Sequence, residues 1–155
     1  MSVLWRAIVT GSPDVARPVF FPESAYRQVK DIWNPDGDYR TRIWAIFRRD
    51  LVLYHNALGR HPDMARLVDV NAAPQAAAWV PAGVCENGVG YWHLPGTRLV
   101  YLAHGTRASF GVWSTISWRG VWYVIHLGPN WTLTSPGSID DPQVGAGTAG
   151  IGPGC

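Results

Sequence analysis

The chain has 155 residues, of which 47% are hydrophobic and 15% charged, so its composition excludes a disordered protein and suits one domain with a buried core. The formal net charge of +2 is too small to indicate a nucleic-acid-binding surface by itself. The sequence has no apolar run of roughly 18 residues and no signal-peptide pattern at its start, which predicts a cytoplasmic protein without a membrane span.

The N-terminal part is expected to combine an extended arm with a first helix. Residues 1–22 read as a strand or an extended arm that ends in RPVFFP. The first helix is predicted to start near Pro22, because proline fits the first turn of a helix, and to run through ESAYRQVKDIW. It should end before Asn34, because the following proline disfavours helical backbone at that residue.

The clearest predicted helix spans residues 39–58. Asp38 is its predicted N-cap, and Gly59 follows its last turn. Its apolar residues recur every three or four positions and form one stripe: Trp44, Phe47, Leu51, Tyr54 and Leu58. A short third helix is predicted in HPDMARLV, with Pro62 in its first turn.

Residues 89–127 alternate in the manner of β-strands and contain recurring two-residue turns. The turns are predicted at Pro95-Gly96, His104-Gly105 and Arg119-Gly120, and they divide this part into the strands 89–94, 97–103, 106–118 and 121–127. An earlier strand is expected within 76–84, and a bend or bulge at Gly111 in the longest strand. We therefore expect one domain over 1–128, followed by an irregular Gly- and Pro-rich arm over 129–155.

Two-residue turns fix the register of the strands, so the residues of the two sheet faces can be predicted. The face toward the helices should be apolar and collect Trp92, Leu94, Leu99, Tyr101, Phe110, Val112, Ile116, Trp118, Tyr123, Ile125 and Leu127. The opposite, outer face should include His93, Arg98, Trp113, Trp122 and His126, with Trp113 opposite His126. Tryptophan and arginine are frequent interface anchors, so these five residues are the predicted binding site for a partner.

Helices followed by a bent antiparallel meander predict an α+β fold, with the helices packed on one face of a curved sheet. This element order over residues 22–127, with the hairpin ISWRGVWYVIHLG, resembles the NTF2-like or cystatin-like superfamily. The resemblance implies a conical pocket between helix 39–58 and the sheet, to which Tyr54, Tyr101 and Tyr123 would contribute. The blocks GYWHLPGTRLVY and ISWRGVWYVIHLG also resemble actinobacterial proteins of unknown function.

The sequence lacks recognisable catalytic and metal-binding patterns. The predicted strands over 89–127 contain no Asp or Glu, although many enzymes of the superfamily bury an acid–base pair in the pocket. The five histidines lack metal-ligand spacing, and no phosphate-binding loop is present. We therefore predict no catalytic residue, no metal and no other cofactor. Cys85 and Cys155 are either two free thiols or a bridge that pins the arm.

Three hypotheses about function follow from these patterns. The first is a non-enzymatic binding or assembly module that uses the outer sheet face for self-association or for a protein partner, with nucleic acid not expected. The second is a small-ligand-binding protein or an isomerase-like enzyme that uses the pocket under helix 39–58. The third is a structural component of a phage or another large particle, in which the arm docks onto a neighbour.

Overall fold

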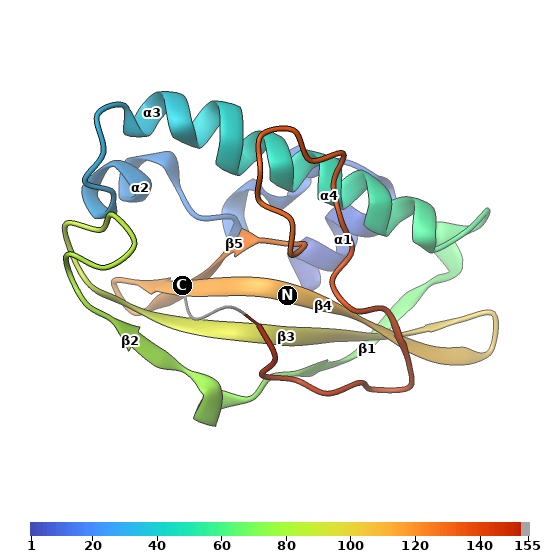
Figure 1. Ribbon diagram of the computed structural model, residues 1–155. Helices are drawn as coiled ribbons and strands as arrows, with labels where there is room; N and C mark the ends of the chain where they lie inside the picture. Colours follow the sequence, from blue (N-terminus) through green and yellow to red (C-terminus); the bar gives the residue numbers. More distant parts are fainter. Residues whose placement is uncertain (153–155) are drawn as a thin grey trace.

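A curved, open antiparallel sheet carries helices on one face in the computed structural model, which describes residues 1–152 (Figure 1). The strands are β1 (Arg66–Asn71), β2 (Ala78–Val80), β3 (Tyr91–Ala103), β4 (Thr106–Trp118), β5 (Val121–His126) and β6 (Gln143–Val144). The helices are α1 (Ser2–Thr10), α2 (Glu23–Val29), α3 (Pro35–Asp38) and α4 (Trp44–Ala57), with the π-helical η2 (Tyr39–Ile43) and the 3₁₀ segments η1 (Pro13–Val19), η3 (Pro62–Met64) and η4 (Pro74–Ala76). The predicted α+β class is confirmed. Within residues 1–152, every helix is too short or too polar to cross a membrane.

The predicted long helix is confirmed, but it begins earlier than expected. α3, η2 and α4 follow one another directly from Pro35 to Ala57. Asn34 caps the start, because its Oδ1 accepts a hydrogen bond from the Gly37 N–H at 2.9 Å. The prediction of Asp38 as N-cap is wrong, since Asp38 has helical backbone and its side chain binds Arg42 instead.

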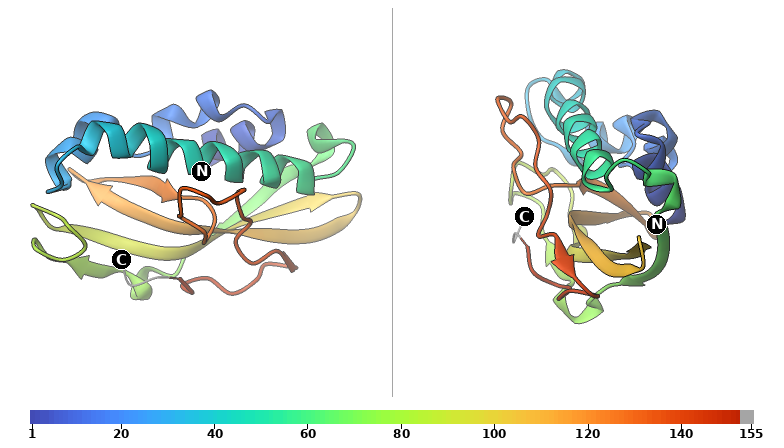
Figure 2. Two further views of the ribbon diagram at one scale, coloured as in Figure 1. Left: turned by 45° about the horizontal axis from the view of Figure 1, so that its top comes forward. Right: turned by 90° about the vertical axis from the view of Figure 1, so that its right-hand side faces the viewer.

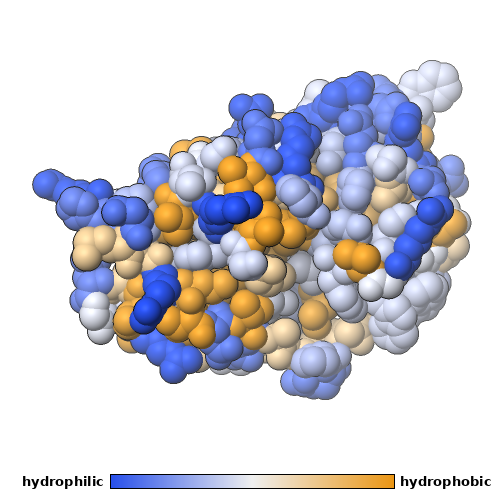
Figure 3. Space-filling model, turned by 180° about the vertical axis from the view of Figure 1, so that it is seen from behind, coloured by the Kyte–Doolittle hydropathy of each residue, from blue (hydrophilic) through white to orange (hydrophobic). Residues whose placement is uncertain are grey.

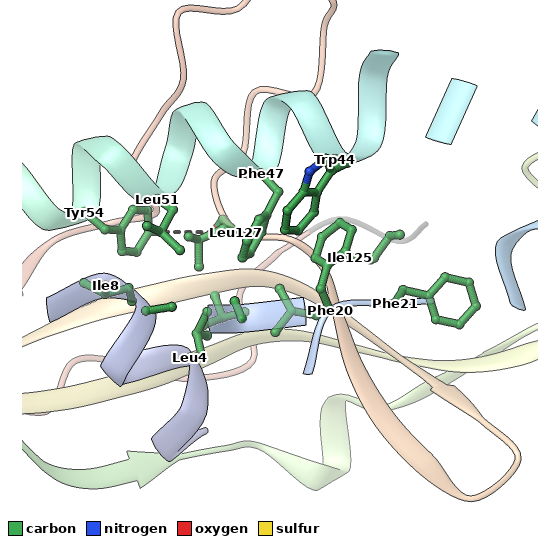
Figure 4. Packing of buried hydrophobic residues seen from close by; sticks show 14 of the residues in the cluster. Leu4, Ile8, Phe20, Phe21, Trp44, Phe47, Leu51, Tyr54, Ile125 and Leu127 are labelled. Atoms are coloured by element: carbon green, nitrogen blue, oxygen red, sulfur yellow. Dashed lines mark hydrogen bonds between the residues drawn. The ribbon is translucent and has the colours of Figure 1, made fainter. Parts of the chain in front are cut away.

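The apolar stripe of this helix forms the centre of the core, as its spacing predicts. All five members are buried: Trp44, Phe47, Leu51, Tyr54 and Leu58. Figure 4 shows the stripe facing Phe20 and Leu127. The ring centroid of Phe20 lies 4.5 Å from that of Phe47 and 5.0 Å from that of Trp44. These aromatic contacts hold the helix against the sheet.

Two local predictions near the N-terminal half are wrong. Residues 1–22 are not an extended arm, because Ser2–Thr10 forms α1, which buries Leu4 and Ile8 in the core (Figure 4). The stretch HPDMARLV holds only the single turn η3, and β1 follows it and pairs with β3. Short apolar runs do not distinguish helix from strand by periodicity, so tertiary contacts decide their structure.

The hairpin turns at His104-Gly105 and Arg119-Gly120 are confirmed. All four turn residues have positive φ, and the predicted pairs Leu99 with Phe110 and Ile116 with Tyr123 are present. Positive φ at both central residues matches the twist of the flanking strands. The sheet has the order β1-β3-β4-β5, with β2 also paired to β3 and β6 to β4.

The predicted turn at Pro95-Gly96 is wrong, because β3 runs straight through it. β3 pairs with β4 from His93 to Ala103 without a register shift. On the other side of β3, β2 reaches only to His93 and β1 begins only at Arg98. Pro95 therefore lies where β3 is locally an edge, which is where a residue without an N–H is tolerated.

The continuous β3 reverses part of the predicted face map. His93 lies on the helix-covered face and is buried, whereas Trp92, predicted in the core, points outward and is half-exposed. The register between β4 and β5 shifts by one residue, because Thr115 pairs with Val124 but Ser114 pairs with His126. This shift also moves a side chain to the other face of the sheet. His126 therefore also faces the helices and does not oppose Trp113.

Residues 129–152, the described part of the predicted arm, are mostly irregular and lie against the rest of the chain (Figure 2). β6 pairs with the part of β4 that β5 does not reach. Further along, the Gly150 N–H donates to the Gly96 carbonyl at 3.0 Å. The arm thus extends the β4 edge and then crosses the outer face to the β3 edge.

The edge strand β1 carries part of the remaining exposed apolar surface. Val68 and Val70 are exposed, and the register of β1 shifts between Leu67 and Asp69. Figure 3, which shows the molecule from behind, has hydrophobic residues in several groups among hydrophilic ones. An irregular edge of this kind pairs poorly with a strand of another molecule.

Candidate functional site

A cavity of about 440 Å³ lies between α2, the α3–η2 segment and strands β3 to β5. α2 and α3, which contribute to its wall, lie over one end of the sheet (Figure 1). Most of its wall is apolar and aromatic: Phe21, Val29, Ile32, Ile43, Tyr91, Trp113, Ile116, Ile125 and Trp131. The polar groups of the wall form two clusters, one on the helices and one on the strands.

The helical cluster consists of Tyr26, Asp38 and Arg42. Arg42 binds the Asp38 carboxylate with both Nε, at 2.7 Å from Oδ1, and Nη2, at 2.6 Å from Oδ2. The Tyr26 hydroxyl also donates to Asp38. Burial would raise the pKa of Asp38, but the hydrogen bonds from Arg42 and Tyr26 hold it below its usual value. Asp38 is therefore an ionised carboxylate that is already fully bound.

The strand cluster consists of His93 on β3, Ser114 on β4 and His126 on β5. Antiparallel register brings them together, since Ser114 pairs with His126 and His93 pairs with Ile116 two residues further along β4. His93 Nε2 lies 2.8 Å from Ser114 Oγ. Burial lowers the pKa of His93, and burial with the nearby charges of Arg42 and Lys30 lowers the pKa of His126 to about 4. Both imidazoles are neutral at pH 7.

A well-anchored loop, residues 81–90, closes one side of the cavity. Its Gly88 N–H donates to the Val29 carbonyl at 2.7 Å, and the Lys30 ammonium donates to the Cys85 carbonyl at 2.6 Å. Asn87 is buried there, with its Nδ2 bound to the Val84 carbonyl at 2.7 Å. The loop is therefore attached to α2 and not free to swing.

Two buried polar atoms of the cavity wall lack a hydrogen-bond partner among residues 1–152. They are Nδ1 of His126 and Oδ1 of Asn87. An unpaired buried polar atom costs about 1–3 kcal/mol, so such atoms are uncommon in the absence of a role. Oδ1 accepts a hydrogen bond, and Nδ1 donates or accepts according to the tautomer of the ring. Both atoms belong to residues that line the cavity.

The structure divides the five residues of the predicted outer-face site. His93, Trp113 and His126 border the cavity, while Trp122 lies exposed on the outer face. Arg98 is buried under the arm, where it binds Ser109 Oγ at 2.8 Å and Asp141 Oδ2 at 3.2 Å. The five residues therefore do not form one surface. His93 on β3 and His126 on β5 point to the face of the sheet opposite to the predicted one.

The tyrosines of the implied pocket do not line this cavity. Tyr54 is fully buried and binds the backbone, Tyr101 packs on Phe110, and Tyr123 packs on Phe21. The space under α4 is filled by the core, and the cavity lies nearer to α2. Cys155, the predicted partner of Cys85, lies outside the described residues.

Tyr26, Asp38, Arg42 and Asn87 are site residues that the sequence patterns did not reveal. Asp38 and Arg42 have the spacing of a helical ion pair, which is usually a surface feature. Only the packing of α2 and η2 over the sheet places them beside the histidines. Within residues 1–152, no three His, Cys, Asp or Glu side chains are grouped so as to hold a metal ion.

Comparisons of the chain with protein-family models, with curated proteins and with solved structures found no match. The function of the cavity is therefore inferred from the chemistry of its own residues.

Proposed function

We propose that the protein binds a small, neutral and largely apolar molecule in the cavity between α2, η2 and the sheet. The observation that carries the proposal is a cavity of about 440 Å³ with a mainly apolar and aromatic wall, to which the neutral imidazoles of His93 and His126 contribute.

The size and lining of the cavity support a small ligand. Ligand pockets commonly have volumes of about 300–1,000 Å³ and mainly apolar walls with a few polar groups. The cavity, of about 440 Å³, has this character, with isoleucines at positions 32, 43, 116 and 125. A bound molecule would gain most of its affinity from this apolar surface and its orientation from the polar atoms.

The charges of the wall favour a neutral ligand. Arg42 is neutralised by Asp38, and Lys30 donates to the Cys85 carbonyl, with its pKa lowered by burial and by the charge of Arg42. His93 and His126 are neutral at pH 7 because burial lowers the pKa of each. A carbonyl or hydroxyl group is the best complement to neutral imidazole and amide groups.

The same pKa directions favour binding over acid–base catalysis. An efficient general acid or base has a pKa near the working pH. The pKa of His126 falls to about 4, and Asp38 is an ionised carboxylate that is occupied by Arg42 and Tyr26. These groups are suited to holding a ligand rather than to exchanging a proton with it.

A fluorescence titration with N-phenyl-1-naphthylamine, a neutral apolar probe, tests the proposal. We expect saturable one-to-one binding, and at least a tenfold loss of affinity in Ile116→Trp, because the indole would occupy the cavity. Val121→Trp adds the same side chain at an exposed position of the same hairpin and should bind like the wild type. A folded Ile116→Trp variant with unchanged affinity, or the absence of saturable binding, would contradict the proposal.

A further inference from the structure

The outer sheet face carries a row of three tryptophans that neither the core nor the cavity uses. Trp79 on β2 pairs with Trp92 on β3, and Ser117 on β4 pairs with Trp122 on β5. The backbone N–H of Trp92 donates a hydrogen bond to Ser117 Oγ at 3.1 Å, and this bond links the two pairs across the sheet. The order along the row is therefore Trp79, Trp92, Ser117 and Trp122, perpendicular to the strands.

These rings stand in solvent, although they are large and apolar. Trp79, Trp92 and Trp122 are 52%, 47% and 45% exposed. Their indole N–H groups have no hydrogen-bond partner within residues 1–152. Since neighbouring strands lie about 4.8 Å apart, the row extends over roughly 14 Å from β2 to β5. The ring centroids of Trp79 and Trp92 lie 5.7 Å apart with their planes at 67°, so the row offers exposed indole surface in more than one orientation.

The row is too small for a stable protein interface. Aromatic side chains present about 150–250 Å² each, so three half-exposed indoles supply roughly 300 Å². A stable protein partner, including a second copy of the chain, requires about 800 Å² on each side. A narrow, extended molecule fits the shape of the row better than a globular surface does.

The charges around the row do not favour a nucleic acid. Single-stranded nucleic acid needs cations that follow its phosphates beside the stacking rings. Arg98 and Arg107, on the outer face of β3 and β4, lie toward the other end of the sheet and are paired with Asp141 and Asp69. Arg119, in the nearby turn, binds Gln28 and lies over Trp118. The row itself consists of neutral residues.

We propose that this tryptophan row binds a neutral polysaccharide whose sugar rings carry equatorial substituents, such as a β-1,4-linked glucan, xylan or chitin chain. Such a ring presents a flat face of C–H groups that stacks on an indole, while its hydroxyl groups accept hydrogen bonds from the indole N–H groups. The three rings would contact successive parts of one extended chain. This site is separate from the cavity and lies on the opposite face of the sheet.

Isothermal titration calorimetry with cellohexaose, xylohexaose and chitohexaose tests the inference on the full-length protein. At least one of them should bind with a Kd of about 1 mM or tighter. Trp92→Ala and Trp122→Ala should each weaken binding about tenfold, the usual effect of losing one stacked ring. Trp33→Ala removes a fully exposed tryptophan outside the row and should leave the affinity unchanged.

Several results would overturn the inference. One is the absence of binding to all three sugars, and another is equal binding by the wild type and by correctly folded Trp92→Ala and Trp122→Ala variants. Binding of a poly-dT oligonucleotide that depends on Trp122 would assign the row to nucleic acid. A dimer in light scattering that dissociates in Trp122→Ala would assign it to a second copy of the chain.

Discussion

Asp50 shows how a single side chain connects the long helix to the C-terminal arm. The residue is fully buried on α4, and its carboxylate accepts hydrogen bonds from the Ser138 N–H at 2.7 Å and the Gly128 N–H at 2.9 Å. Burial raises the pKa of Asp50 to about 6, although the two backbone N–H groups act against the shift. Asp140, two residues after Ser138, also has a pKa raised to about 6, again by burial.

The raised pKa of Asp50 predicts that the contribution of this residue to stability falls as the pH rises, whereas the lowered pKa of His126 acts in the opposite direction. Between about pH 4 and pH 6 Asp50 keeps a proton in the folded state that it has released in the unfolded state, so its contribution to the free energy of unfolding falls over this interval. Asp50 should contribute a change on the order of 2–3 kcal/mol. In urea unfolding, the free energy of unfolding of Asp50→Asn should therefore rise relative to that of the wild type from pH 4 to pH 7. For the exposed Asp63→Asn the difference from the wild type should stay constant over this range.

For single residues, the sequence predicts the members of the core better than the members of the candidate site. The stripe of α4 follows from its spacing alone, because every member contacts the core. Asp50 and Asn87 look like ordinary surface residues in the sequence, since polar side chains are seldom buried. Their burial depends on the arm and on the loop 81–90, which the local pattern does not place.

At the scale of elements, the predicted site differs from the observed one because a shift of one residue in a strand moves its side chains to the other face of the sheet. Pro95-Gly96 has the composition of a hairpin turn, but β4 pairs with β3 on both sides of it. Pro95 is tolerated because neither β1 nor β2 pairs with β3 at this residue. The local sequence contains no pattern that predicts this unpaired position. His93 and His126 were predicted to share a face, and they do, but it is the face under the helices.

The packing of the arm against β4 depends on the absence of a side chain at Gly111. A Cβ at this residue would lie 2.0 Å from Asp140 Oδ2, and the Gly111 N–H donates to the Asp140 carbonyl at 2.8 Å. Gly111→Ala should therefore displace the arm and lower the free energy of unfolding by about 1–3 kcal/mol. Hydrogen exchange should increase over residues 138–150. Gly88→Ala, where a Cβ has ordinary space, should change neither measurement, and an unchanged Gly111→Ala variant would refute this account.

For the molecule as a whole, the sheet separates two surfaces of different chemistry. The face under the helices holds the cavity, with neutral imidazoles and apolar walls. The outer face is covered by the arm around Arg98 and left open around the tryptophan row. The sequence-based hypothesis placed one partner site on the outer face, and it did so by merging residues that belong to both surfaces.

The separation predicts that the two proposed binding events are independent. Trp122→Ala should leave the affinity for N-phenyl-1-naphthylamine unchanged, and Ile116→Trp should leave oligosaccharide binding unchanged, because the two side chains lie on opposite faces of the sheet. Titrating one ligand in the presence of a saturating amount of the other measures this directly. A change in either Kd beyond about threefold would show that the sheet couples the two surfaces.

The position of the C-terminal arm in the chain also has a consequence for folding. Asp50, Tyr54 and Arg98 each find part of their hydrogen-bond partners in residues 138–141, which follow β1 to β5 in the sequence. A chain that has formed β3, β4 and β5 without the arm therefore leaves these buried groups only partly paired, and its β4 edge is open at Ala108 and Ser109. Docking of the arm closes that edge and completes these hydrogen bonds.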